Sequence, residues 1–211
     1  NDLLLPYIKF ETATFQRLVS KFRDLELNPY DLKGSFKYSV RYKGITTHFG
    51  LGGVHGARKD IYTSNDEFVI MSSDVTSFYP NLAIRNKWSP AHLPKEEFCD
   101  QYEWFFDERK KIPKSDPRNY VYKIVLNSTY GLSNDENSFL YDPELTMRIT
   151  LNGQLSLMML YEMICERIPN AVPLMQNTDG LETRIPRKYV DEYMQICKEW
   201  EDITNLQLEH D

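Results

Sequence analysis

The chain has 211 residues, a net charge of −6 and 41% hydrophobic residues, which is enough for one large or two small domains with a buried core. The charged fraction of 27% is ordinary and excludes a wholly disordered chain. No apolar run approaches the roughly 20 residues of a membrane span, and the three cysteines lack the spacing of a disulfide scaffold or a zinc site. We therefore expect a cytoplasmic protein with no membrane partner.

The first third of the chain is predicted to be mixed. Apolar residues at helical spacing predict an amphipathic helix over residues 12–25. Strict alternation over residues 36–42 predicts a strand, with Lys43-Gly44 as the turn of a hairpin. The four glycines of residues 49–56 predict a loop, or a backbone that another group approaches closely.

The middle third carries a short strand and two helices. The apolar run of residues 68–71 predicts a buried strand that delivers Asp74 at its end, followed by a tight turn. A helix is expected from Pro94 to Ile112, where Pro113 stops it. A second helix is expected over residues 117–130, with a cap before Pro117 and with Gly131 closing it.

The last third is predicted to return to a mixed fold. A core helix is expected over residues 151–168, then a strand, turn and strand over residues 171–186, and a final helix from Arg187. With no repeat or linker, the pattern predicts an α+β fold with a helical insertion.

Three segments carry groups suited to chemistry. They are DVTSFYP (74–80), KIVLNSTYG (123–131) and QNTDG (176–180). The first and third each present an aspartate at a turn, and in the second Lys123, Asn127 and Tyr130 share one helix face. Each segment alone also fits a plain turn or a solvated helix face.

Together the segments favour magnesium-assisted phosphoryl transfer. Carboxylates are the ligands that hard divalent cations prefer, and residues 105–123 contain six basic and three acidic residues that suit a triphosphate. The global charge of −6 means that an anionic ligand would be held locally.

The three segments resemble, in order, motifs A, B and C of family B DNA polymerases of the kind found in phages and other viruses. Motif A of that family reads Asp-x-x-Ser-Leu-Tyr-Pro, and here Phe78 replaces the leucine. Motif B, Lys-x-x-x-Asn-Ser-x-Tyr-Gly, is matched at every fixed position. Motif C, commonly Tyr-Gly-Asp-Thr-Asp-Ser, is matched less well, because Asn177 replaces its first aspartate and Gly180 its serine.

The resemblance implies a role for each matched residue. Asp74 and Asp179 would be the catalytic carboxylates and, with the Val75 carbonyl and Asn177, would hold two Mg²⁺ ions, for which Mn²⁺ can substitute. The implied nucleotide-binding residues are Ser77, Phe78, Tyr79, Arg109, Lys110, Lys123 and Asn127. Arg109 and Lys110 are alternatives for one phosphate ligand, and Tyr79 would exclude a 2′-hydroxyl. The implied DNA-binding residues are Tyr130 and Gly131, and also Gly52 and Gly53, which resemble part of a Tyr-x-Gly-Gly element but fit a plain turn equally well.

The family fold implies a polymerase palm, with an antiparallel sheet backed by helices, and a short two-helix fingers insertion. The expected division is a leading segment over residues 1–66, palm over 67–94 and 132–211, and fingers over 95–131, without exonuclease or thumb. The implied partners are primer–template DNA, deoxynucleoside triphosphates, and the missing polymerase domains or a processivity factor. A phage-encoded chain would act in the host cytoplasm.

Two other functions remain open from the sequence. Asn177 removes one negative charge from the metal site, so the chain could be a catalytically weakened module that binds nucleotide or DNA. A nuclease or a template-independent nucleotidyltransferase would keep the two aspartates but has no use for Tyr79 or Tyr130. The four scattered histidines, His210 among them, are interpreted as surface or turn residues, and Glu182 as a solvent-facing residue of its strand.

Overall fold

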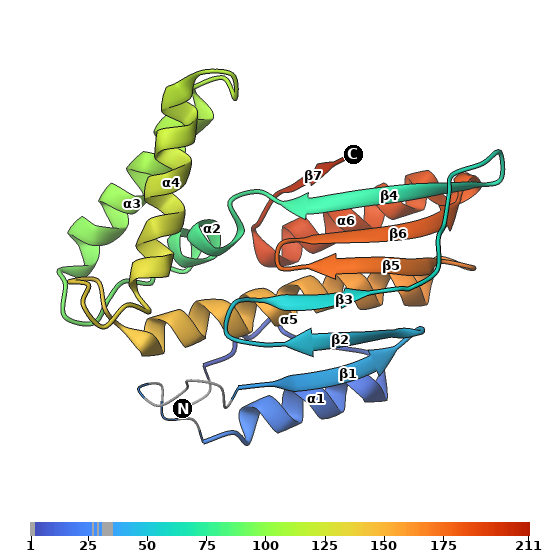
Figure 1. Ribbon diagram of the computed structural model, residues 1–211, viewed down its shortest axis with the longest axis horizontal. Helices are drawn as coiled ribbons and strands as arrows, with labels where there is room; N and C mark the ends of the chain where they lie inside the picture. The colour runs from blue at the N-terminus through green and yellow to red at the C-terminus, as the bar shows by residue number, and fades with distance from the viewer. Residues whose placement is uncertain (1–2, 27, 29, 31–35) are drawn as a thin grey trace. The chain divides into compact units, whose positions relative to one another are not determined.

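The computed structural model describes residues 3–26, 28, 30 and 36–211. These residues form an α+β fold with a seven-stranded antiparallel sheet and six α-helices (Figure 1). The strand order is β1-β2-β3-β5-β6-β4-β7, so strands from both ends of the chain alternate in one sheet. The chain divides into two compact units, unit 1 with residues 1–76 and 151–211 and unit 2 with residues 77–150.

Unit 1 contains the whole sheet. Its strands are β1 (Tyr38–Tyr42), β2 (Ile45–Phe49), β3 (Val54–Ala57), β4 (Phe68–Val75), β5 (Val172–Asn177), β6 (Gly180–Pro186) and β7 (Leu208–His210). Its helices are α1 (Ala13–Arg23), most of α5 (Pro143–Arg167) and α6 (Val190–Thr204), which follows a 3-10 turn (Arg187–Tyr189).

The helices of unit 1 cover one face of this sheet (Figure 1). The hydroxyl of Tyr161 in α5 donates to the carbonyl of Tyr42 in β1 at 3.0 Å, and the ring of Phe15 in α1 lies 5.0 Å from the Tyr42 ring. Trp200 of α6 is fully buried and its indole donates to the Ser156 carbonyl of α5 at 2.8 Å. The hydrophobic core therefore lies between the sheet and these helices.

The other face of the sheet, here called the open face, carries exposed polar side chains. In β2, Thr46 and His48 are exposed, while Ile45, Thr47 and Phe49 are buried. This alternation is that of a sheet with one packed face and one solvated face.

Unit 2 consists of α2 (Phe78–Arg85), α3 (Lys95–Lys110), α4 (Pro117–Leu132) and the first turns of α5. The α4 helix begins as expected, because the Asp116 carboxylate accepts from the Arg118 amide at 2.9 Å and Pro117 occupies the first helical position. Within the described residues, no helix combines the length and apolar character needed to cross a bilayer.

Several elements predicted from the sequence are confirmed. The first helix buries four apolar residues of its periodic face, and the strand ending at Tyr42 turns at Lys43-Gly44, where both residues have positive φ, 48° and 84°. The helix beginning after Pro94 and the strand–turn–strand of residues 171–186 are also present. All three cysteines are free and buried.

For residues 49–56, the second of the two predicted alternatives is confirmed. Residues 54–56 belong to β3, and a Cβ on Gly53 would lie 2.8 Å from Cγ2 of Thr178, while one on Gly56 would overlap Oε1 of Gln176. Two predicted helix boundaries were wrong. Gly131 does not close α4 but lies inside its last turn. The helix expected from Leu151 begins at Pro143, because the Asp142 carboxylate caps it by accepting from the Leu145 amide at 3.0 Å.

The sequence also failed to predict three short elements. The tight turn expected after Asp74 leads into helix α2, in which Pro80 is tolerated at the third position because first-turn amides need no helical acceptor. Strands β3 and β7 are four and three residues long, too short to show a periodic pattern.

A buried carboxylate joins α5 to the start of α1. Glu162 is 3% exposed and accepts from the backbone amides of Glu11 and Thr12 at 2.8 and 3.0 Å, and from the Thr12 hydroxyl. Thr12 is the N-cap residue of α1 but makes no cap bond with its own side chain. Glu162 therefore accepts from amides at the beginning of α1, where the first amides have no acceptor within the helix.

We predict that Glu162→Ala lowers the free energy of unfolding by about 2–4 kcal/mol, because it leaves these donors without an acceptor. Urea unfolding followed by circular dichroism measures the change. Glu199→Ala is the matched control, since this more exposed carboxylate pairs with Arg167 at the surface and should cost less than about 1 kcal/mol. Equal losses in the two variants would contradict the capping role.

Candidate functional site

Two aspartates more than a hundred residues apart in the chain lie at neighbouring strand ends in unit 1. Asp74 is the penultimate residue of β4, and Asp179 lies in the two-residue turn between β5 and β6. The Val75 amide donates to the Asp179 carbonyl at 2.7 Å, and the register pairs Asp74 with Gly180. The structure thus brings together the two carboxylates that the sequence singled out.

Gly180 makes room for the Asp74 carboxylate. A Cβ built on Gly180 would overlap Oδ1 of Asp74, so any larger residue would force this side chain or the strand to move. The resembling motif has serine at this position, and the packing gives a physical reason for glycine in this chain. The Asp74 side chain therefore lies across β6, toward the turn that holds Asp179.

The turn itself is braced by the connection between β2 and β3. The Thr178 amide donates to the Val54 carbonyl at 2.9 Å, with Thr178 at a φ of 40°. Gly53 has a φ of 151°, and a Cβ there would lie 2.8 Å from Cγ2 of Thr178. Gly53 therefore has a structural reason to be glycine, whereas a Cβ on the exposed Gly52 would meet no atom within 4 Å.

Further carboxylates surround Asp74. Burial raises the pKa of Asp74 above its ordinary value, and the negative charges of Asp179, Asp211, Glu182 and Glu209 raise it further. Glu209 pairs with Asp74 in the register, and the Asp211 backbone bonds that of Ser72. The sequence missed both acids because their register with β4 depends on the short strand β7.

Glu182 belongs to the same group. It pairs across β6 and β4 with Ser72, two residues from Asp74, and is only partly exposed. Glu182 therefore lies on the solvent-facing side of its strand, as predicted. It is also on the same face of the sheet as Asp74. We call Asp74, Asp179, Glu182, Glu209 and Asp211 the acidic cluster.

A hydrogen-bonded group on the packed face fixes the strand that carries Asp74. The hydroxyl of Ser73 contacts the Tyr193 hydroxyl of α6 at 2.5 Å and Nδ1 of His210 in β7 at 2.8 Å. His210, which the sequence predicted to be a surface or turn residue, instead belongs to strand β7 and is hydrogen-bonded within unit 1. Its side chain is half-buried because β7 places it beside Tyr193.

The acidic cluster suits a hard divalent cation. Its donors are carboxylate oxygens, which hard divalent cations prefer as ligands. Among the described residues, no three His, Cys, Asp or Glu side chains form a preformed cage. Mg²⁺ commonly uses one or two carboxylates together with water and substrate phosphates, so the residues present fit this ion.

Asn177 and the Val75 carbonyl are the other implied metal ligands. Asn177 is exposed on the open face and pairs with Gly180, which itself pairs with Asp74. Its amide oxygen is a neutral donor in the same cross-strand row as the Asp74 carboxylate. Val75 ends β4, where its amide already bonds the Asp179 turn.

In unit 2, Arg109 lies at the N-terminus of α2. Its Nη1 donates to the Ser77 hydroxyl at 2.6 Å, and its Nε donates to the Asn119 side chain at 3.3 Å. Ser77 precedes α2 with a φ of 45°, and the first amides of the helix, those of Phe78 and Tyr79, have no acceptor within the helix. A guanidinium beside a helix N-terminus is suited to bind a phosphate.

The side chains of Arg109 and Lys110 make different contacts. The Lys110 ammonium lies 4.1 Å from the centre of the Phe106 ring and 3.8 Å from the Asp107 carboxylate. Of the two candidates for the phosphate ligand, Arg109 is the one with a hydrogen bond to Ser77 among the described residues. Arg109 and Lys110 therefore do not share one set of contacts.

Two tyrosine rings from separate motifs meet in unit 2. The rings of Tyr79 and Tyr130 lie 4.8 Å apart, and the Tyr130 hydroxyl contacts the Thr150 hydroxyl at 2.8 Å. Burial raises the pKa of Tyr130. Phe78 packs on Tyr79 and is buried, so its ring fills the core position that leucine holds in the resembling motif.

The remaining motif B residues lie on the surface of α4. Lys123 and Asn127 are exposed, one helical turn apart, and Tyr130 follows on the same side. A Cβ on Gly131 would meet no atom within 4 Å, so open space adjoins the helix there.

A scan against models of known protein families and a search of curated proteins found no match to this chain.

We predict that Gly180→Ala lowers stability by about 1–3 kcal/mol and weakens Mn²⁺ binding, because the added methyl group takes the space of the Asp74 carboxylate. Urea unfolding and titration of Mn²⁺ by electron paramagnetic resonance measure the two effects. Gly52→Ala is the control, because its methyl group enters open space. The packing argument fails if the two variants bind Mn²⁺ equally well.

Proposed function

We propose that the chain is the catalytic core of a DNA-directed DNA polymerase, which adds deoxynucleotides to a primer 3′-hydroxyl. The observation that carries this proposal is the register of β4 and β6. It supports a shared metal-binding role for Asp74 and Asp179, the acids of the segments that resemble motifs A and C. In this proposal the sheet of unit 1 is a palm, and α3 and α4 are fingers.

In unit 1, Asp74 and Asp179 would hold Mg²⁺, with the Val75 carbonyl and Asn177 as further oxygen donors. When bound, the ions would neutralise phosphate charge and lower the pKa of the attacking hydroxyl. The neighbouring Glu182 and Glu209 add negative charge that favours cations at this end of the sheet. Gly180 keeps the Asp74 carboxylate turned toward Asp179.

In unit 2, the amides of Ser77 and Phe78 would receive triphosphate oxygens, with Arg109 beside them. Lys123 and Asn127 on α4 would bind the same nucleotide, and the ring of Tyr79, packed on Tyr130, would lie under the deoxyribose. A rigid aromatic side chain at that position leaves no room for a 2′-hydroxyl. Tyr130 and Gly131 would lie against the new base pair.

The substrates in this proposal are deoxynucleoside triphosphates and primer–template DNA, used in the cytoplasm. The acidic net charge favours additional basic surface elsewhere, from further polymerase domains or a processivity factor.

One observation favours a second candidate function. Asn177 supplies a neutral oxygen on the open face where the resembling motif has a carboxylate. A site weakened in this way could bind nucleotide or DNA without turnover.

Primer extension tests the proposal. The 211-residue chain is incubated with a labelled primer–template, the four deoxynucleotides and Mg²⁺ or Mn²⁺. We expect template-directed extension that falls by about a thousandfold or more in Asp179→Ala, because losing a metal ligand removes several kcal/mol of transition-state stabilisation. Asp66→Ala, which removes an exposed carboxylate from a loop of unit 1, should leave the rate unchanged.

Asn177→Asp separates the two functions. If only this variant extends primers, the natural chain is a weakened binding module. If the natural chain extends primers and Asp179→Ala does not, the proposed activity stands. Extension that Asp179→Ala leaves unchanged would refute the proposed site.

A further inference from the structure

The open face of the sheet carries opposite charges on its two halves. One cross-strand row, given by the register of the strands, passes through all seven strands at Ser39, His48, His55, Asn177, Gly180, Asp74 and Glu209. The acidic cluster occupies the β6-β4-β7 end of this row. The β1-β2-β3 end carries histidines and has cationic side chains around it.

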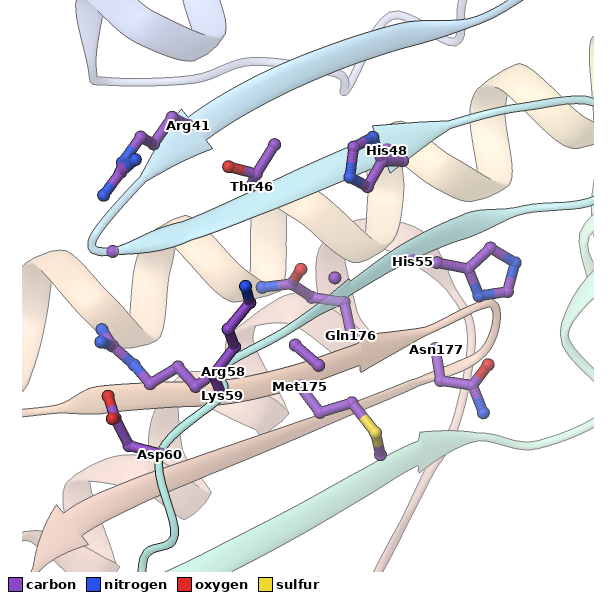
Figure 2. A pocket seen from close by; sticks show the side chains of 13 residues that line it. Arg41, Thr46, His48, His55, Arg58, Lys59, Asp60, Met175, Gln176 and Asn177 are labelled. Carbon is purple, nitrogen blue, oxygen red and sulfur yellow. The ribbon is translucent and has the colours of Figure 1, made fainter.

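A groove of about 880 Å³ lies over the β1-β2-β3 half of the open face (Figure 2). Its charged lining residues are Arg41, Arg58, Lys59 and Asp60, a net charge of +2 in a chain whose total is −6. His48 and His55 also line it and are exposed. The groove ends at Asn177, so it meets the acidic half of the open face.

Hydrogen bonds hold two of the side chains, Arg58 and His48, that form the floor of the groove. The Arg58 guanidinium donates to the Pro173 carbonyl at 2.6 Å and also to the Lys43 carbonyl, which places its charge between β5 and the first hairpin. Nδ1 of His48 contacts the Ser39 hydroxyl at 2.8 Å. Arg41 and Lys59 are exposed above this floor and can reach a ligand.

We propose that this basic groove binds the sugar–phosphate backbone of a single DNA strand and leads it toward Asn177. The choice of DNA rests on the proposed function, whereas the binding itself does not require catalysis. Cationic side chains contact phosphates without reading sequence, and three of the four charged side chains that line the groove are basic.

The dimensions favour a strand over a small anion. Asn177, on β5, lies two strand spacings from β4, about 10 Å, and His48, on β2, lies four, about 19 Å, so the groove leads away from Asp74 over the length of more than one nucleotide. Arg41 on β1 and Arg58 and Lys59 in the segment after β3 place positive charges at separate points of the groove, which suits successive phosphates.

The experiment measures binding of the 211-residue chain to fluorescently labelled (dT)12 by anisotropy, in EDTA so that no metal ion contributes. The double variant Arg41→Gln/Lys59→Gln removes two groove charges. We expect at least a tenfold weaker affinity and a salt slope reduced by about 1.4, that is about 0.7 for each lost phosphate contact on a single strand.

The matched control is Arg17→Gln/Lys198→Gln, which changes the net charge equally but lies on α1 and α6, away from the open face. It should bind (dT)12 like the natural chain. Thr46→Glu adds a negative charge to the groove at an exposed strand position and should weaken binding without removing a native contact.

Three results would overturn the inference. They are no binding of (dT)12 by the natural chain, equal loss in the two double variants, and affinity that does not rise from (dT)3 to (dT)12 while inorganic phosphate competes. The third result would indicate a single-anion site.

The proposal for the groove and the proposal of polymerase activity can be refuted independently of each other. Loss of strand binding in the groove variant, with no primer extension by the natural chain, would refute only the polymerase function. Extension by the natural chain, with a groove variant that binds DNA like the control, would refute only the groove.

Discussion

The seam between β4 and β6 is the constraint on which the functional geometry depends. One backbone hydrogen bond, from the Val75 amide to the Asp179 carbonyl, ties the end of β4 to the turn between β5 and β6. The same register puts Gly180 opposite Asp74, and the missing side chain gives the carboxylate its space. A shift of one residue would turn Asp74 toward the packed face and destroy the acidic cluster.

The acidic cluster is positioned from the packed face of the sheet. Ser73 joins Tyr193 and His210 directly behind Asp74, and the buried Trp200 anchors α6 to α5. Burial, and after it the negative charges of the four neighbouring carboxylates, raise the pKa of Asp74. A group with a shifted pKa at a rigid strand end is a common feature of sites that bind metal and substrate.

The sequence predicted the elements that carry strong local patterns and failed where long-range pairing decides. The strands that lead to Asp74 and Asp179 could be predicted, because the apolar residues 68–71 and 172–175 are each followed by polar residues and a turn. Glu209 and the basic groove could not. Glu209 reaches Asp74 only through the three-residue β7, and His55 reaches Asn177 only because β3 pairs with a strand more than a hundred residues later. Neither register has a signal in local periodicity.

Paramagnetic broadening by Mn²⁺ in the NMR spectrum of the ¹⁵N-labelled chain tests the central claim, that the acidic half of the open face is a cation site. We expect substoichiometric Mn²⁺ to broaden first the amide signals of residues 73–75, 178–182 and 208–211, which surround the cluster. Signals of β1 and β2 should persist, because these strands lie several strand spacings away. Broadening centred on any other part of the chain, or spread evenly over exposed carboxylates, would contradict the claim.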